Sequence, residues 1–326
     1  MSQLQRRAFL KALGLLSASQ GFAAGWPGGD KPSGPPKVFK LGSISDEWTP
    51  DLEKALQLMK GYGLSWVEIR TVWGVYNTEA SPQQVKKIKS LVQQYGFKVS
   101  VVDTALYKCT LPGTEPLPGE RHDYSPAQEK SLYAGQMDLL KRAIERAHEL
   151  GTDKVRVFSF WRVANPERYY SRIADELSKA AELAKRSGIR VMLENESACN
   201  VATGHESAKI LARVKASNFG ANWDIGNGYP LGEASYPDGY NALPKDRIWH
   251  MHIKDMRCSP GSKSCHTVIA GQGQVDLLGQ LRALVRNGYQ GTMSLEPEFQ
   301  TKTISHLEGT ERSMQGLLRI MHQAVT

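Results

Sequence analysis

The chain has 326 residues, of which 40% are hydrophobic and 23% are charged, as in an ordinary globular protein. Its formal net charge is +8, but the lysines and arginines form no basic stripe interleaved with aromatic residues. This distribution argues against a nucleic-acid-binding protein. The length is sufficient for one large domain with a substantial core.

The N-terminus has the features of an export signal. Residues 5–11, with the sequence QRRAFLK, resemble the twin-arginine export motif, and a mildly apolar stretch follows over residues 12–24. We therefore predict a signal peptide over residues 1–24, recognition by the twin-arginine export machinery, and a periplasmic or secreted protein. The stretch is too short and too rich in Gly and Ser for a stable membrane anchor.

A Gly- and Pro-rich linker over residues 25–36, predicted to be disordered, precedes a catalytic domain over residues 37–326. In that domain, short apolar runs alternate with stretches that have helical hydrophobic spacing. We predict strands over residues 39–44, 66–70, 99–105, 154–159, 190–194, 220–224, 250–254 and 292–296. We predict helices over residues 52–62, 82–95, 128–150, 168–187, 205–215, 277–287 and 310–323. Residues 226–247 are expected to be rich in loops.

Eight strands joined by helices favour the α/β class and a single (β/α)8 TIM barrel. In the last four strands polar and apolar residues alternate, as with Glu194 beside Leu193. This alternation points polar groups toward the barrel axis and apolar groups toward the helices. The alternative is an open doubly wound sheet, although no Gly-x-Gly-x-x-Gly sequence follows the first strand.

Four consecutive predicted strands end in side chains that bind metal ions. These side chains are Glu194, Asp224, His252 and Glu296. Because the strands of a barrel converge on one mouth, we expect three carboxylates and one imidazole to meet there. Mn²⁺ suits this ligand set best, and Mg²⁺, Co²⁺, Fe²⁺ and Zn²⁺ are alternatives. One divalent metal ion at this place indicates an enzyme.

These motifs resemble those of the sugar phosphate isomerase/epimerase family, the xylose isomerase-like TIM barrels. The matching pieces are VEIR, LENE, NWDIGN, HMHIKD, GQGQVD and SLEPE, within about residues 37–323. The resemblance implies that a metal chelates a substrate carbonyl and its neighbouring hydroxyl, while Glu194 and Glu296 act as an acid/base pair through an enediolate. Lys254, one inward step beyond His252, is expected either to donate to the enediolate oxygen or to pair with a rim carboxylate.

Two positions depart from the family pattern, because Asn227 and Glu196 stand where many members carry His. We expect Asn227 to bind a sugar hydroxyl, and Glu196 to bind a hydroxyl or act as an acid/base. Further candidate substrate-binding residues lie on the predicted strands or after them: Glu68, Trp73, Tyr107, Arg156, Trp161 and Arg257. The alternatives are packing under loops for the aromatic residues and an internal ion pair for Arg156. A phosphate site in the glycine-rich segment 271–273, near Arg257, is a weaker expectation.

Four cysteines in an exported chain predict disulfides. Cys258 and Cys265 bracket a short loop, whereas Cys109 and Cys199 each follow a predicted strand and could meet at the rim. We favour the pairs Cys258–Cys265 and Cys109–Cys199. Four free thiols are the alternative.

The leading functional hypothesis is a metal-dependent isomerase or epimerase of a keto-sugar or keto-glycoside. A lyase or dehydratase is the closest alternative, because elimination begins with the same proton abstraction. An endonuclease IV-like nuclease and a non-catalytic sugar-binding barrel are weaker alternatives. The expected partner is a small sugar rather than a nucleic acid, and the sequence leaves a homo-oligomer open.

Overall fold

The structure is a computed structural model that describes residues 33–118, 125–259, 264–299 and 303–326. The predicted signal peptide and most of the predicted linker therefore lie outside the described residues. Of the linker residues that are described, Ser33 and Gly34 present their carbonyl oxygens to Nε2 of His322, at 3.2 and 3.1 Å. Disorder of the linker stays a prediction.

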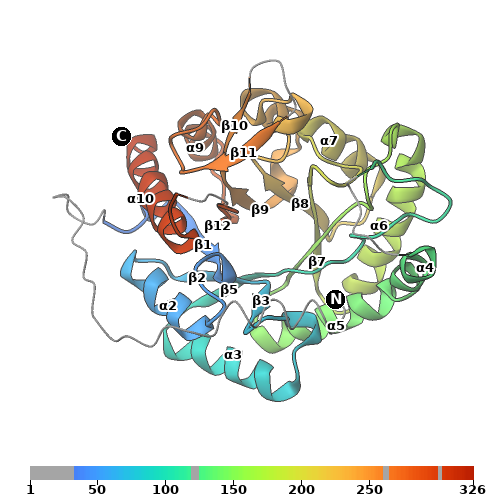
Figure 1. The fold of residues 1–326 in the computed structure, drawn as a ribbon, viewed down its shortest axis with the longest axis horizontal. Coiled ribbons are helices and arrows are strands. Elements are labelled where there is room, and N and C mark those ends of the chain that lie inside the picture. The colour runs from blue at the N-terminus through green and yellow to red at the C-terminus, as the bar shows by residue number, and fades with distance from the viewer. Residues whose placement is uncertain (1–32, 119–124, 260–263, 300–302) are drawn as a thin grey trace. The chain divides into compact units, whose positions relative to one another are not determined.

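Parallel strands of the described chain close into a barrel in the order β1-β12-β9-β8-β7-β6-β5-β2, with helices around it (Figure 1). The strands are β1 Lys40–Ile44, β2 Trp66–Ile69, β5 Lys98–Val102, β6 Lys154–Val157, β7 Arg190–Glu194, β8 Phe219–Asp224, β9 Ile248–Ile253 and β12 Thr292–Leu295. The helices are α2 Leu52–Gly61, α3 Pro82–Gln94, α4 Pro126–Ala134, α5 Gln136–Leu150, α6 Tyr170–Lys185, α7 Gly204–Arg213, α8 Tyr240–Ala242, α9 Leu277–Arg286 and α10 His306–Ala324. The predicted TIM barrel is confirmed.

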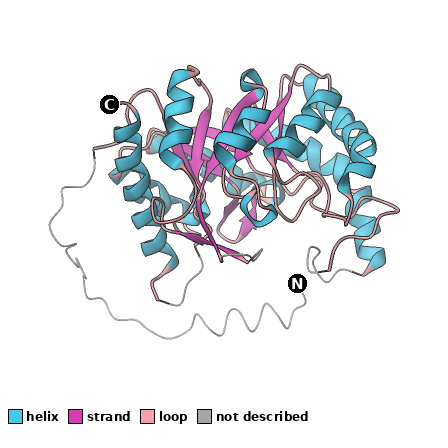
Figure 2. Ribbon diagram, turned by 90° about the horizontal axis from the view of Figure 1, so that it is seen from above, coloured by secondary structure: helices cyan, strands magenta, loops and turns pink. Residues whose placement is uncertain are grey.

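Local sequence signals set the ends of the helices. Ser81 caps α3 by accepting a hydrogen bond from the Gln84 N–H, and the Gln84 side chain accepts one from the Ser81 N–H in return. Helix α5 ends at Gly151, whose φ of 76° is the left-handed conformation that glycine adopts without a Cβ clash. Figure 2 shows the helices flanking the strands of the barrel.

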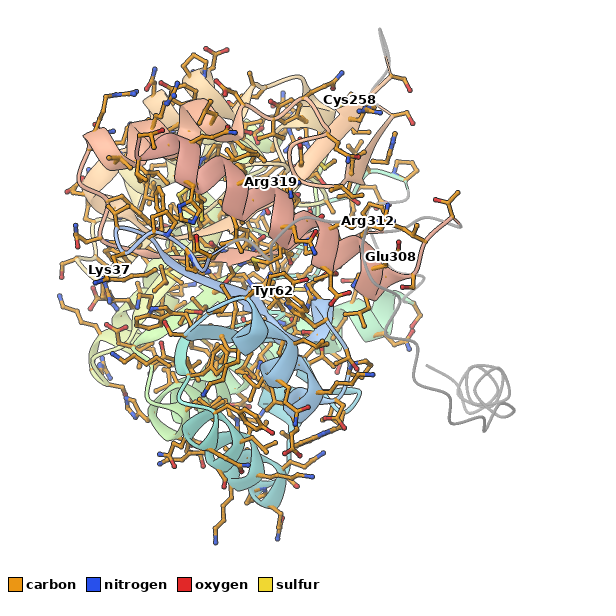
Figure 3. All side chains as sticks on the ribbon, turned by 90° about the vertical axis from the view of Figure 1, so that its left-hand side faces the viewer. Lys37, Tyr62, Cys258, Glu308, Arg312 and Arg319 are labelled. Carbon is orange, nitrogen blue, oxygen red and sulfur yellow. A yellow bond between two sulfur atoms is a disulfide. The ribbon has the colours of Figure 1, made fainter. Side chains whose placement is uncertain are left out.

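The last helix closes the ring of helices next to the first. Figure 3 shows α10, with Glu308, Arg312 and Arg319 along it, passing over the end of α2. There the Gln315 side chain donates a hydrogen bond of 3.3 Å to the hydroxyl of Tyr62. No helix of the described residues combines the length and the apolar character that crossing a membrane requires.

The structure differs from the predicted elements in three places. The predicted helix 128–150 is divided at Gly135 into α4 and α5. Two antiparallel hairpins were not predicted, β3 Thr71–Val72 with β4 Val75–Tyr76, and β10 Asp255–Cys258 with β11 Cys265–Val268. Strands of two to four residues are too short to show a hydrophobic period. Residues 226–247, expected to be rich in loops, hold four short helical elements with loops between them: η4 Tyr229–Leu231, η5 Ser235–Gly239, α8 Tyr240–Ala242 and η6 Lys245–Arg247.

One predicted disulfide is present and the other is absent. Cys258 and Cys265 are bonded across the β10–β11 hairpin, whereas Cys109 and Cys199 are free, buried thiols. The backbone of Trp161 lies between these two: its N–H donates to the Cys109 carbonyl, and it forms a β-bridge with Cys199. Two backbone spacings of about 4.8 Å exceed the roughly 7 Å that a disulfide can span between Cα atoms, so the predicted Cys109–Cys199 pair is wrong.

Candidate metal centre and active site

Glu194, Asp224, His252 and Glu296 meet at the carboxyl ends of the barrel strands. One ligand atom of each lies within 4.8 Å of those of the other three, and all four residues are buried. Strand pairing explains the meeting, because His252 on β9 lies beside Asp224 on β8 and beside Ser294 on β12. Glu296 follows Ser294 by two residues and therefore shares its inward face. The sequence thus identified side chains that the fold brings together.

The imidazole of His252 is oriented by a carboxylate beneath the cluster. Its Nδ1 lies 3.0 Å from Glu194 Oε1 and 3.0 Å from Glu296 Oε2, while its Nε2 lies 3.0 Å from Glu68 Oε1. The other oxygen of Glu68 lies 2.8 Å from Nε2 of His250. A hydrogen on Nε2 of His252 leaves Nδ1 as a free ligand, the usual arrangement of a carboxylate behind a metal-binding histidine.

The sequence led us to expect that Glu68 binds substrate. Its contacts place it behind the histidines instead. It is fully buried and both of its carboxylate oxygens contact histidines. Burial would raise the pKa of Glu68, but His252 and His250 together hold that pKa well below its usual range. Glu68 stays ionised as the anchor of both imidazoles.

Two carboxylate oxygens in the cluster are buried without a hydrogen-bond donor. These are Asp224 Oδ2 and Glu296 Oε2, although Lys254 Nζ lies 3.1 Å from each, close enough for charge attraction. Burial raises the pKa of Asp224 to about 7, against the opposing effect of Lys254. Carboxylate oxygens that accept no hydrogen bond, beside an imidazole nitrogen, match the ligands of a divalent cation. The residues present therefore fit one divalent metal ion.

Lys254 is part of the cluster and forms the expected salt bridges to rim carboxylates. Its ammonium also reaches Glu298 Oε2 at 2.5 Å. Its stem packs on Gly226, where an added Cβ would lie 2.3 Å from Lys254 Cγ. Burial would lower the pKa of Lys254, but Asp224 and Glu296 raise it well above its usual range. Lys254 is therefore a fixed cation at the mouth.

Arg156 takes the alternative role that the sequence allowed, an internal ion pair. Its Nη1 lies 2.6 Å from Glu194 Oε2, and its Nε lies 3.2 Å from Asp103 Oδ1. The sequence did not lead us to Arg70, which binds the other glutamate of the cluster: its Nη1 lies 2.8 Å from Glu296 Oε1. Because Arg70 follows Glu68 by two residues, it shares the inward face, and this spacing could have revealed it.

A second ion pair lies at the mouth of the barrel. Glu196 Oε2 accepts from Lys108 Nζ at 2.9 Å, and this ammonium lies 4.4 Å from the ring centre of Phe158. Burial would raise the pKa of Glu196, but Lys108 lowers it to about 2. Phe158 packs with Trp161 and Cys199 in a small apolar cluster. Trp161 thus packs among apolar side chains, the alternative that the sequence allowed for the aromatic residues, and the pairing of Glu196 with Lys108 was not predicted.

Asn227 uses its polar atoms to shape the loop after β8. Its side-chain N–H donates to the carbonyl of Asn195 at 2.9 Å, and its backbone N–H donates to Asp224 Oδ1 at 2.9 Å. The Gly226 N–H donates to the same Asp224 oxygen at 2.7 Å. These bonds fix Asp224 and use one of the two side-chain N–H groups of Asn227.

Three residues that the sequence predicted to bind substrate contact residues outside the metal-binding cluster. The Tyr107 hydroxyl donates to the Glu176 carbonyl on α6, the Trp73 ring lies 4.7 Å from Lys87 Nζ on α3, and Arg257 donates to the Gln272 carbonyl. Trp73 and Tyr107 have φ angles of 52° and 62°. These left-handed turns redirect the chain, so a position after a strand did not predict where the side chain points.

The glycine-rich loop after β11 encloses a carboxylate of the chain itself. Asp255 Oδ2 accepts from the N–H groups of Gly271 and Gly273, and its Oδ1 accepts from those of Met256 and Val275. A Cβ on Gly273 would lie 2.0 Å from Asp255 Oδ1. Asp255 therefore fills the place in which the sequence left room for a phosphate.

A parallel α/β barrel with a carboxylate–histidine cluster at its mouth defines the class of this protein. The family model described as xylose isomerase-like TIM barrel matches residues 56–320. The chain therefore belongs to this family.

Curated relatives match part of the chain. An inosose dehydratase of Bacillus licheniformis is 25% identical over 154 residues, which are 43% of this chain and 50% of that protein. A 3-dehydroshikimate dehydratase of Pseudomonas aeruginosa is 28% identical over 175 residues, which are 49% of this chain and 26% of that protein. The matches thus span at most half the length of these relatives.

Solved structures share the fold. An L-ribulose 3-epimerase has a TM-score of 0.65 at 18% identity, over 87% of this chain and 95% of that chain. The IOLI protein with a bound zinc atom has a TM-score of 0.66 at 19% identity, over 87% and 99%. An Escherichia coli 3-keto-D-glucoside 4-epimerase has a TM-score of 0.63 at 16% identity, over 86% and 99%.

Proposed function

We propose that this chain is a metal-dependent isomerase or epimerase that moves the proton next to the carbonyl of a keto-sugar or keto-glycoside. The observation that carries the proposal is the meeting of Glu194, Asp224, His252 and Glu296 within 4.8 Å at the barrel mouth. The epimerases and the zinc-bound protein among the similar folds support the proposal. We propose Mn²⁺ as the natural ion, because the set has mainly oxygen ligands.

Glu194 and Glu296 are the proposed acid/base pair. They come from β7 and from the end of β12, with β8 and β9 between them, and each places one oxygen 3.0 Å from Nδ1 of His252. They therefore approach the same centre from different sides. In an epimerase one carboxylate removes the proton and the other returns it on the opposite face.

The chemistry requires help, because a proton next to a ketone is far too weakly acidic for an unaided carboxylate. A bound divalent ion would stabilise the negative charge on the substrate oxygens by several kcal/mol. A positioned base contributes roughly 10²–10⁴-fold to the rate. Lys254, held between Asp224 and Glu296, stays protonated and can donate a hydrogen bond to the enediolate oxygen.

A dehydratase is the second candidate, and the two curated relatives favour it. Elimination begins with the same proton abstraction, after which the C–H electron pair forms a C=C bond and the β-oxygen leaves. The leaving oxygen needs a proton. Lys108, paired with Glu196 at the mouth, is the donor that we assign to this step.

A deuterium-exchange screen with the Mn²⁺-loaded protein tests both candidates. Keto-sugars, an inosose and a 3-keto-glucoside are incubated in D₂O, and the products are analysed by NMR. Deuterium in a rearranged sugar without loss of the aglycone supports the isomerase or epimerase. Release of the aglycone or of water supports the lyase. A protein that binds Mn²⁺ but exchanges no proton of any of these substrates contradicts both.

A further inference from the structure

Both glutamates of the proposed acid/base pair have one carboxylate oxygen bound by an arginine. Glu296 Oε1 lies 2.8 Å from Arg70 Nη1, and Glu194 Oε2 lies 2.6 Å from Arg156 Nη1. The remaining oxygen of each glutamate, Oε2 and Oε1 respectively, lies 3.0 Å from Nδ1 of His252. Each carboxylate is therefore held on one side by a guanidinium and directed on the other side to the shared centre.

Further carboxylates hold Arg70 in a single orientation. Its Nε contacts Asp46 Oδ2 at 3.0 Å and its Nη2 contacts Glu47 Oε1 at 2.5 Å. The second oxygen of Glu47 accepts from the Glu298 N–H at 3.1 Å. A planar guanidinium with a carboxylate on each of its three nitrogens cannot rotate without losing charge-assisted hydrogen bonds. The position of Glu296 thus depends on residues outside the candidate metal centre.

Arg156 has fewer carboxylate partners than Arg70 and lies in a more buried place. Its Nε lies 3.2 Å from Asp103 Oδ1 without forming a hydrogen bond, and its side chain is only 4% exposed. Arg156 extends from β6, which is the neighbour of the strand that carries Glu194. Arg70, directly after β2, and Arg156, on β6, thus each bind one oxygen of one of the two glutamates.

We propose that Arg70 and Arg156 are positioning residues. Arg70 binds one carboxylate oxygen of Glu296 and Arg156 binds one of Glu194, so that only the other oxygen of each glutamate faces metal and substrate. This inference rests on the proposed function. A carboxylate without such a partner can turn and place both oxygens on a cation. A displacement of about 1 Å can cost about 10²-fold in rate, so fixing the carboxylate benefits proton transfer more than metal binding.

Arg70 is the better residue for a test, because it is partly exposed and Arg156 is fully enclosed. Arg70→Gln removes the charge, and Arg70→Lys keeps the charge without the planar fork. The matched control is Arg190→Gln. Arg190 binds Asp153 Oδ2 through Nε at 2.9 Å and Nη2 at 2.6 Å, at the start of β7 and the opposite end of the barrel.

Three measurements separate positioning from a structural ion pair. For both Arg70 variants we expect proton exchange to fall about 10²-fold, the Mn²⁺ dissociation constant to stay within about tenfold, and the EPR spectrum of bound Mn²⁺ to change. In Arg70→Gln the dissociation constant changes little because losing a nearby cation strengthens Mn²⁺ binding while a freer Glu296 weakens it. In Arg70→Lys it changes little because the positive charge is kept. Arg190→Gln should leave all three unchanged.

Several outcomes overturn the inference. Exchange at the wild-type rate in Arg70→Gln would do so, as would Mn²⁺ binding weakened more than about tenfold in parallel with lost thermal stability. If the wild-type protein exchanges no sugar proton, the proposed function fails by itself. The EPR comparison then decides on the inference, because identical spectra of wild type and Arg70→Gln mean that Arg70 does not position Glu296.

Discussion

At the scale of single residues, the role of each ionisable group depends on what holds its second polar atom. His252 presents Nδ1 to the cluster because Glu68 contacts its Nε2, and Asp224 presents Oδ2 because two backbone N–H groups bind its Oδ1. The oxygens of Asp224 and Glu296 that accept no hydrogen bond are the atoms to which a cation would bind. Two predictions follow from this arrangement.

The first concerns Glu296. Glu296→Gln keeps the size of the side chain and an acceptor oxygen but removes the base, so we expect proton exchange into the keto-sugar to fall at least about 10²-fold. Circular dichroism and thermal unfolding should match those of the wild type within a few degrees. Full exchange activity in this variant would remove Glu296 from the mechanism.

The second concerns Glu68. Glu68→Gln replaces a carboxylate that contacts two histidines by an amide with one acceptor oxygen, so one imidazole loses its partner. We expect Mn²⁺ affinity, measured by titration calorimetry, to fall about 10–100-fold. The control is Glu129→Gln, because the Glu129 carboxylate is also buried but accepts from the Thr110 N–H outside the cluster. Equal affinities in the two variants would contradict the role of Glu68.

At the scale of secondary-structure elements, the barrel strands were predictable and the hairpins between them were not. In residues 190–194 the apolar residues predict the strand, and the single carboxylate at its end marks the residue that faces the site. The inward position of Arg70 could be predicted from its spacing, but its pairing with Glu296 and the pairing of Lys108 with Glu196 could not. Each depends on a partner that the fold brings from a distant part of the sequence, as with Lys108 and Glu196.

The hairpin β10–β11 gives a prediction about stability. Cys258 and Cys265 are separated by seven positions, and closing so short a loop stabilises a chain by about 2–3 kcal/mol in the loop-entropy model. Replacing both residues by Ser should therefore lower the melting temperature by several degrees, measured by calorimetry. A reducing agent should lower it in the wild type and leave it unchanged in the double variant. Equal melting temperatures in all samples would contradict this account.

At the scale of the whole molecule, the barrel brings residues from distant segments to one mouth, and the sequence pattern was enough to predict this. The error over Cys109 and Cys199 has a clear cause, because proximity to one rim does not exclude an intervening segment such as that of Trp161. The sequence therefore predicted which residues lie at the rim. It did not predict which loop segments lie between them.

Export by the twin-arginine route stays a prediction. If residues 1–24 are the signal, replacing Arg6 and Arg7 together by Lys should leave the full-length chain in the cytoplasmic fraction of a bacterial host. The unchanged chain should reach the periplasm in a shortened form. Immunoblots of the two fractions provide the measurement. Equal export of both chains would show that the arginine pair is not the signal.

The central claim is that Glu194, Asp224, His252 and Glu296 bind one divalent ion. Anomalous X-ray diffraction at the manganese edge, on crystals of the Mn²⁺-loaded protein, tests it most directly. The account predicts a single peak among these side chains, at ligand distances of about 2.0–2.3 Å. A peak elsewhere in the chain, or no peak near the four side chains at saturating Mn²⁺, would contradict it.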